Sequence, residues 1–112
     1  MTQEVFNAYR IMWLFVFFDL PVGTKEERKR ATDFRKDLLT DGFDMMQFSV
    51  YNRACPTKEN AEVHIKRVKA AVPPDGKVSI LTVTDKQFSL LINYWGNKIQ
   101  KPPEPPEQLL LF

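Results

Sequence analysis

The sequence predicts a single α+β domain in which helices connect the strands of one antiparallel sheet. Three observations indicate this class: residues 11–18 form an unbroken aromatic and β-branched run, amphipathic segments of helical period occupy 24–40 and 57–72, and a second β-branched run occupies 78–84. The chain of 112 residues is long enough for one hydrophobic core and too short for two. With 44% hydrophobic and 27% charged residues, its composition is typical of a globular protein.

The run at residues 11–18 predicts the most buried strand of the sheet. It shows no polar alternation, so both of its faces should be covered. The run is too short to span a bilayer, and the turn signal Asp19-Leu20-Pro21 stands where a signal peptide would carry small residues for cleavage. We therefore expect no membrane partner.

Residues 24–40 predict the first helix, with Thr24 as its N-cap and Gly42 just beyond its end. Its core-facing side chains recur at helical spacing and are Ala31, Phe34 and Leu38. At about 100° per residue, five basic side chains fall within an arc of about 120° on a separate part of the helix surface. They are Lys25, Arg28, Lys29, Arg35 and Lys36.

The middle of the chain predicts further strands and a second helix. Residues 43–54 are extended in character, and a bend at Asn52-Arg53 leads into a short third strand. Residues 57–72 form the second helix, and His64 is predicted to lie on the surface because it falls outside the apolar stripe. That stripe consists of Ala61, Ile65, Val68 and Val72.

After the break at residues 73–76, residues 78–84 predict the last main strand and 85–95 a short helix. We assign residues 1–101 to the domain, with 1–10 as an N-terminal extension. Residues 102–112 comprise a stiff Pro-rich spacer and an apolar terminal strand at 108–112 that is expected to dock on the sheet.

The order strand, helix, strand, strand, helix, strand is that of the ferredoxin-like βαββαβ fold, here with a short extra helix and a C-terminal strand. Right-handed crossovers place both main helices on one face of the sheet. The opposite face then lacks a cover of its own. A second copy of the same sheet is the simplest cover, so we expect a symmetric homodimer.

Few residues are available for catalysis. The single cysteine, Cys55, excludes an internal disulfide framework and a multi-cysteine zinc site, and it favours a reducing, cytoplasmic location. Asp19 follows the buried strand directly. It is either a simple turn residue or, if a two-fold axis brings two copies together, half of a carboxylate pair that binds Mg²⁺ or another divalent cation.

The chain has a formal net charge of +2, and the basic arc on its first helix has two interpretations. It can follow a phosphate backbone, or it can be an ordinary solvated helix face. An RNA-recognition motif shares the predicted element order, but its stacking strand requires glycine and aromatic residues. Residues 78–84 contain neither, so this alternative is disfavoured.

Three segments, residues 13–21, 43–51 and 81–88, together with the helix segment 27–36, resemble the CRISPR-associated protein two family, especially the variants of type II systems. The resemblance implies a ferredoxin-like homodimer that partners the CRISPR integrase during spacer acquisition. It implies that Asp19 corresponds to the family's strand-end aspartate, which is assigned to Mg²⁺ binding and to nuclease activity on RNA or DNA. Many members serve as scaffolds that hold double-stranded spacer DNA.

The function expected from these observations is that of a dimeric DNA-binding scaffold for the CRISPR integrase, with a metal-dependent endonuclease site at Asp19. A stand-alone, toxin-type ribonuclease of the same fold is the alternative, and an adjacent integrase gene and repeat array would argue against it. Residues 108–112 also resemble the short peptide that docks on the replication sliding clamp, although a sheet-completing strand explains them better.

Overall fold

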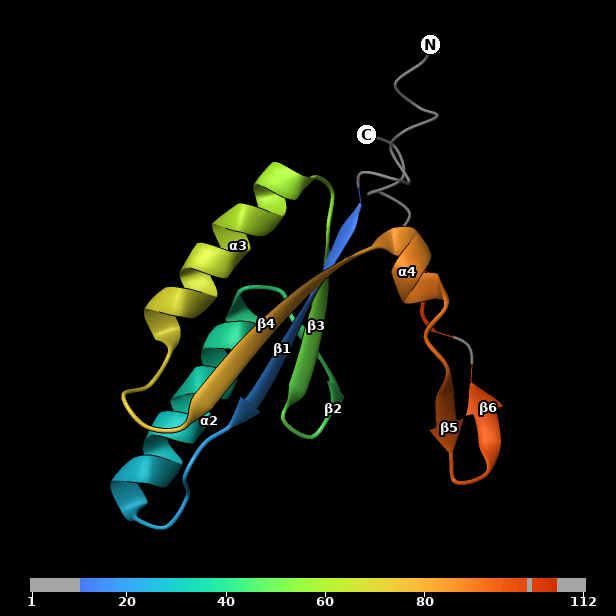
Figure 1. The fold of residues 1–112 in the computed structure, drawn as a ribbon. Helices are drawn as coiled ribbons and strands as arrows, with labels where there is room; N and C mark the ends of the chain where they lie inside the picture. The colour runs from blue at the N-terminus through green and yellow to red at the C-terminus, as the bar shows by residue number, and fades with distance from the viewer. Residues whose placement is uncertain (1–10, 101, 107–112) are drawn as a thin grey trace.

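The structure, a computed structural model, describes residues 11–100 and 102–106. The predicted N-terminal extension and the terminal strand at 108–112 lie outside the described residues. The α+β class is confirmed (Figure 1). Its elements are β1 (Met12–Asp19), α2 (Lys25–Thr40), β2 (Asp44–Gln47), β3 (Val50–Cys55), α3 (Lys58–Ala71), β4 (Lys77–Thr84), α4 (Asp85–Ser89), β5 (Asn93–Trp95) and β6 (Lys98–Gln100).

The four longer strands form one antiparallel sheet in the order β2-β3-β1-β4, and α2 and α3 lie together on one side of it (Figure 1). The central strand β1 alternates between the two faces. Leu14, Val16 and Phe18 belong to the core that packs against α2 and α3, whereas Trp13 and Phe15 belong to a second core on the other face. We call this other face, opposite α2 and α3, the open face.

The core under the helices forms largely as the periodicity of the sequence predicts; Val72, predicted to complete the apolar stripe of the second helix, lies beyond the end of α3 and is exposed, and Ile65 is only partly buried. Ala31, Phe34 and Leu38 of α2 are buried, and so are Ala61 and Val68 of α3. Thr24 caps α2 in a capping box, because its hydroxyl accepts from the Glu27 amide and the Glu27 carboxylate accepts from the Thr24 amide. These features confirm the predicted helix and its core-facing residues.

The open face is partly covered by α4 of the same chain, which corrects the expectation that it lacks any cover. The ring of Phe88 stacks on Trp13 with centroids 3.9 Å apart. The indole Nε1 of Trp13 donates to Asp85 Oδ1 over 2.8 Å. At the other end of the sheet Phe17 stays 39% exposed and Leu81 50% exposed, so the cover reaches only the half beside α4.

Two predicted element boundaries were wrong. The hairpin between β2 and β3 turns at Phe48-Ser49, where Ser49 has a φ of 64°, and the predicted bend at Asn52-Arg53 lies inside β3. The helix predicted to reach Trp95 ends at Ser89.

The hairpin β5–β6 takes the place of that longer helix and forms a separate two-stranded sheet that projects from the main body (Figure 1). Aromatic Tyr94 and Trp95 favour a strand, and Gly96, with a φ of 64°, provides the turn. None of the helices in the described parts of the chain combines the length and the apolar character needed to cross a membrane.

Candidate metal and nucleic-acid site

Asp19 is the last residue of β1, so the pleat of the strand determines where its side chain points. It follows Phe17 by two positions and therefore shares the open face with it. In the β1–β4 register Asp19 lies directly across from Lys77. The side chain is exposed, and among the described residues no hydrogen bond or ion pair engages its carboxylate. Asp19 is thus an accessible anion at the exposed end of the open face.

The backbone around Asp19 is held by a close approach of the α3–β4 loop. A Cβ atom built on Gly76 would lie 2.7 Å from the Asp19 carbonyl oxygen, and Gly76 has a φ of 92°. The same loop is tied to α2 by an ion pair between Asp75 and Arg30, with Nη2 and Oδ2 3.2 Å apart. Sequence reasoning treated residues 73–76 only as a break. The glycine in that break was the one available signal of a tight approach.

The loop between Asp19 and α2 is fastened by Arg28. Its Nη1 donates to the carbonyl oxygens of Val22 at 3.2 Å and Gly23 at 3.5 Å. Arg28 was predicted to bind nucleic acid, and here part of its guanidinium supports the loop that leads away from Asp19. Its other N–H groups remain accessible, because the side chain is exposed.

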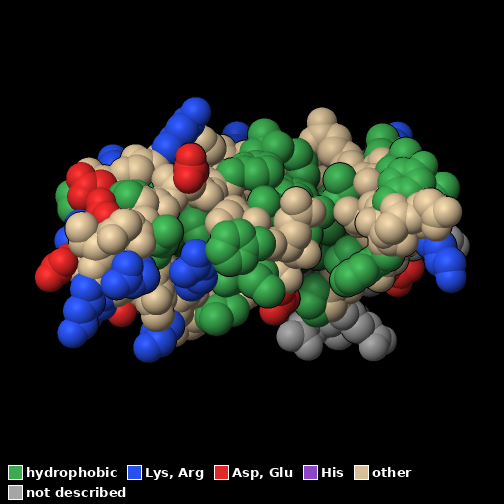
Figure 2. Space-filling model, turned by 90° about the horizontal axis from the view of Figure 1, so that it is seen from below, with side chains coloured by type: hydrophobic (Ala, Val, Ile, Leu, Met, Phe, Trp, Pro, Cys, Tyr) green, Lys and Arg blue, Asp and Glu red, His purple; other side chains and the backbone are tan. Residues whose placement is uncertain are grey.

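The predicted basic residues all lie on α2 but differ in their surroundings. Lys29 pairs with Asp33 over 2.9 Å, an exposed ion pair one helical turn apart. Lys25 and Lys36 are exposed and have no carboxylate partner among the described residues. Figure 2 shows Lys and Arg side chains gathered at the end of the molecule where α2 lies, with hydrophobic side chains beside them.

Arg35 differs from the other basic residues because it is half-buried and close to two aromatic rings. Its guanidinium carbon lies 5.8 Å from the centroid of Phe18 and 5.2 Å from that of Phe48. Phe48 stands in the β2–β3 turn and is 76% exposed. The sequence placed Phe48 in an alternating strand, so this aromatic–cation stack was not predicted.

Within one chain Asp19 presents a single exposed carboxylate to a divalent cation. Among the described residues no three His, Cys, Asp or Glu side chains come close enough together to hold an ion. Mg²⁺ usually keeps several waters and binds through one or two carboxylates. The exposed Asp19 carboxylate fits one such ligand, and a second would have to come from another copy of the chain.

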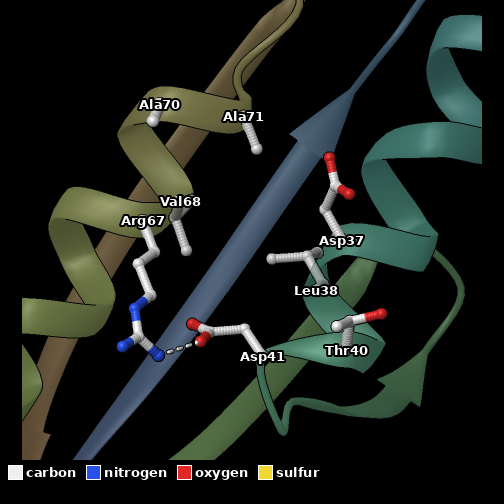
Figure 3. A pocket seen from close by; sticks show the side chains of 8 residues that line it. All are labelled: Asp37, Leu38, Thr40, Asp41, Arg67, Val68, Ala70 and Ala71. Atoms are coloured by element: carbon white, nitrogen blue, oxygen red, sulfur yellow. Dashed lines mark hydrogen bonds and ion pairs between the residues drawn. The ribbon is translucent and has the colours of Figure 1, made fainter.

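A second polar cluster lies at the opposite end of α2, around a cavity of about 410 Å³ between α2 and α3 (Figure 3). Asp41 accepts from His64 Nδ1 at 2.7 Å and from Arg67 Nη1 at 2.8 Å, and Arg53 donates to its carbonyl oxygen. Figure 3 shows the Asp41 and Arg67 side chains pointing toward each other.

The prediction that His64 lies on the surface was wrong. Its side chain is 6% exposed, because Asp41 gives it a polar partner at the edge of the core. Burial raises the pKa of Asp41, but hydrogen bonds and positive charge from Arg67 and His64 outweigh that effect and hold the pKa below its ordinary value. Both carboxylate oxygens of Asp41 are satisfied by His64 and Arg67, which indicates a structural network, although the buried Nε of Arg53 has no partner among the described residues.

Residues 12–91 match the sequence model of the family described as CRISPR associated protein Cas2. The chain belongs to the Cas2 family. A relative from Parvibaculum lavamentivorans named CRISPR-associated endoribonuclease Cas2 is 54% identical over 101 residues, which cover 90% of this chain and 100% of the relative. A protein of the same name from Flavobacterium psychrophilum is 50% identical over 106 residues, which cover 95% of this chain and 92% of that relative.

A solved structure described as the crystal structure of cas2 has a similar fold, with a TM-score of 0.53. The two chains are 24% identical, and the likeness covers 87% of this chain and 95% of the other. The Cas2 family match extends from β1 through α4, so it includes Asp19 and the whole of α2. The hairpin β5–β6 lies beyond it.

Proposed function

We propose that the protein serves CRISPR spacer acquisition as a dimeric, DNA-binding scaffold for the CRISPR integrase, and that Asp19 forms a metal-dependent endonuclease site in the dimer. The single observation that carries the proposal is the position of Asp19 on the open face, two residues beyond the exposed ring of Phe17. A second copy that covers Phe17 would bring the two Asp19 carboxylates toward each other.

The apolar part of the open face supports the proposed homodimer. Phe17 and Leu81 stay exposed on adjacent strands while the other half of this face is covered by α4. Burying apolar surface stabilises association by about 25 cal/mol per Å² before the costs of binding. A two-fold arrangement covers the same residues on both copies. The antiparallel order β2-β3-β1-β4, with both long helices on one side, supports a ferredoxin-like protomer.

In this dimer the two Asp19 side chains would hold the cation. A bound Mg²⁺ or another divalent ion would supply a Lewis acid for phosphodiester cleavage. Asp19 itself positions the ion, and its own position is kept by Gly76 behind the strand end. Without the cation two facing carboxylates repel each other, so we expect metal to strengthen the association of the two copies.

The basic surface of α2 supports binding of double-stranded DNA, with RNA as an alternative substrate. Lys25 and Lys36 are exposed and unpaired among the described residues, and lysine contacts to phosphate add affinity that depends on salt. A two-fold axis would double this surface. The names of the two relatives give endoribonuclease as their activity, which favours a nuclease over a purely structural protein.

Asp19→Asn tests the enzymatic part of the proposal. We expect it to abolish metal-dependent cleavage of RNA and DNA while leaving binding to duplex DNA unchanged, because the substitution keeps the size of the side chain and removes its charge. The matched control is Asp75→Asn, an exposed aspartate of the adjacent loop that faces Arg30. Cleavage that survives in Asp19→Asn would refute the site.

Co-purification with the CRISPR integrase tests the scaffold. We expect the unmodified protein and Asp19→Asn to bind the integrase equally and to support spacer acquisition equally if the scaffold role is the biological one. RNA cleavage without integrase binding would instead favour the toxin-type ribonuclease. A purified protein whose mass matches a single 13.1 kDa chain at high concentration would overturn the dimer.

A further inference from the structure

We infer that Phe48 is a stacking platform for one unpaired base of a nucleic acid whose backbone lies on α2. The inference rests on the proposed function and specifies its substrate as a strand with an unpaired nucleotide near Asp19. Phe48 presents a ring that is 76% exposed. Aromatic rings bind bases of any sequence, since every base has a π-face.

The Phe48 ring contacts a cationic side chain of α2. The Arg35 guanidinium carbon lies 5.2 Å from the Phe48 centroid and 5.8 Å from that of Phe18, so one cation contacts both rings. Phe18 itself is buried against Phe34 and Tyr51. Phe48 thus has a cationic neighbour that itself contacts the buried Phe18 ring, and most of its own surface is accessible to a base.

The turn that carries Phe48 is fastened to β1 one residue before Asp19. The amide of Phe18 donates to the carbonyl oxygen of Ser49 at 3.1 Å. Ser49 has a φ of 64°, a left-handed conformation that residues other than glycine seldom adopt. Local strain of this kind is maintained by its surroundings and is concentrated at functional sites. The turn that carries Phe48 is thus fastened beside the end of β1, with Phe48 on the helix side and the Asp19 side chain on the open face.

The position of the platform argues against burial in the proposed dimer. Phe18 points into the core beneath α2 and α3, and Arg35 belongs to α2. Phe48, which leans on that pair, lies on the helix side of the sheet, whereas the second copy would cover the open face. On this side Phe48 adjoins Arg35 of α2. Figure 2 shows Lys and Arg side chains, which are groups that contact phosphates, gathered at the end of the molecule where α2 lies.

The test measures binding of the full chain without divalent metal, so that cleavage does not interfere. The probes are short single strands of RNA and of DNA, each carrying one 2-aminopurine whose fluorescence falls on stacking, and a blunt DNA duplex of the same sequence. We expect Phe48→Leu to weaken binding of single strands about 5- to 150-fold, the range that corresponds to one stacked base, and to remove the quenching. Phe48→Trp should keep both.

Blunt duplex binding should change less than about two-fold in Phe48→Leu, because a paired base offers no free face. Tyr94→Leu is the matched control, since it removes an exposed aromatic ring on β5. Equal binding of single strands by Phe48→Leu and the unmodified protein would overturn the inference and leave the proposed function intact. Equal losses for single strands and duplex, or an altered oligomeric mass, would also overturn it.

Failure of the proposed function gives a different result. In that case the unmodified protein binds neither single strands nor duplex. Comparing the RNA and DNA single strands shows which nucleic acid provides the unpaired base. Tighter binding of RNA indicates a ribonuclease substrate. Equal or tighter binding of DNA indicates the ends of a spacer duplex.

Discussion

Gly76 approaches Asp19 so closely that any side chain on Gly76 would collide with the backbone of β1. The carbonyl oxygen of Asp19 would lie 2.7 Å from a Cβ atom at position 76, and the φ of 92° already favours glycine. The end of β1, and with it the proposed metal ligand, is therefore set by a glycine in a distant loop.

Gly76→Ala should destabilise the protein by more than about 2 kcal/mol, because left-handed strain and a backbone collision add together. Chemical denaturation measures this loss. Gly96→Ala is the control, since Gly96 also has a positive φ, of 64°, but no atom lies within 4 Å of its added Cβ. It should cost about 1–2 kcal/mol from strain alone. Equal costs at the two positions would contradict the close approach.

Asp41→Asn should reduce stability at neutral pH by about 1–3 kcal/mol, because it removes the charged acceptor shared by His64 and Arg67. The pKa of Asp41 is lower in the folded protein than its ordinary value, so its ionised form stabilises the fold above that value. This contribution is lost as the pH falls through the folded-state pKa.

Unfolding curves measured from neutral to acidic pH test this dependence. The unmodified protein should lose more stability on acidification than Asp41→Asn does. Asp33→Asn is the control, because its ion pair with Lys29 is exposed and contributes less than about 0.5 kcal/mol. Parallel pH profiles for the unmodified protein and Asp41→Asn would show that the cluster does not stabilise the fold through this charge.

Phe88→Ala should destabilise the protein by about 3–5 kcal/mol, because it removes the ring that stacks on Trp13 and leaves a cavity over the open face. The same variant should bind a hydrophobic dye more strongly. Leu90→Ala, two residues further along and 71% exposed, should change stability by less than about 0.5 kcal/mol. A small loss for Phe88→Ala would mean that α4 is not part of the core.

Lys25→Ala and Lys36→Ala should each lower the salt dependence of duplex binding by about one phosphate contact, a change of about 0.9 in the slope of log K against log salt. Arg30→Ala is the control, because Arg30 faces Asp75 and lies outside the predicted basic arc. Titrations at several salt concentrations measure the slopes. A slope that stays constant in both lysine variants would show that neither Lys25 nor Lys36 contacts a phosphate.

The features set by local sequence could be predicted. Thr24 caps α2 through its own neighbour Glu27, and the spacing of Phe34 and Leu38 follows from helical geometry alone. The strand β1 was evident from an unbroken apolar run. In each case the residues that determine the element lie within a few positions of each other along the chain.

The features missed depend on contacts between distant residues. His64 is buried because Asp41, 23 residues away, accepts its hydrogen bond. Phe88 covers Trp13 from 75 positions further along the chain, so the open face has more cover than the sequence suggested. The pairing of Arg35 with Phe48 likewise requires the β2–β3 turn to meet α2. The pattern of a single sequence does not show which distant residues meet in the fold.

Disulfide cross-linking of Asp19→Cys tests most directly whether two chains bring this position together. The natural cysteine, Cys55, is buried and does not compete, and Lys58→Cys on the exposed start of α3 measures random collision. Mild oxidation followed by a non-reducing gel should convert most of the Asp19→Cys protein to a covalent dimer, much faster than Lys58→Cys. Equal and slow cross-linking of both variants, with a monomeric mass in solution, would contradict the paired site.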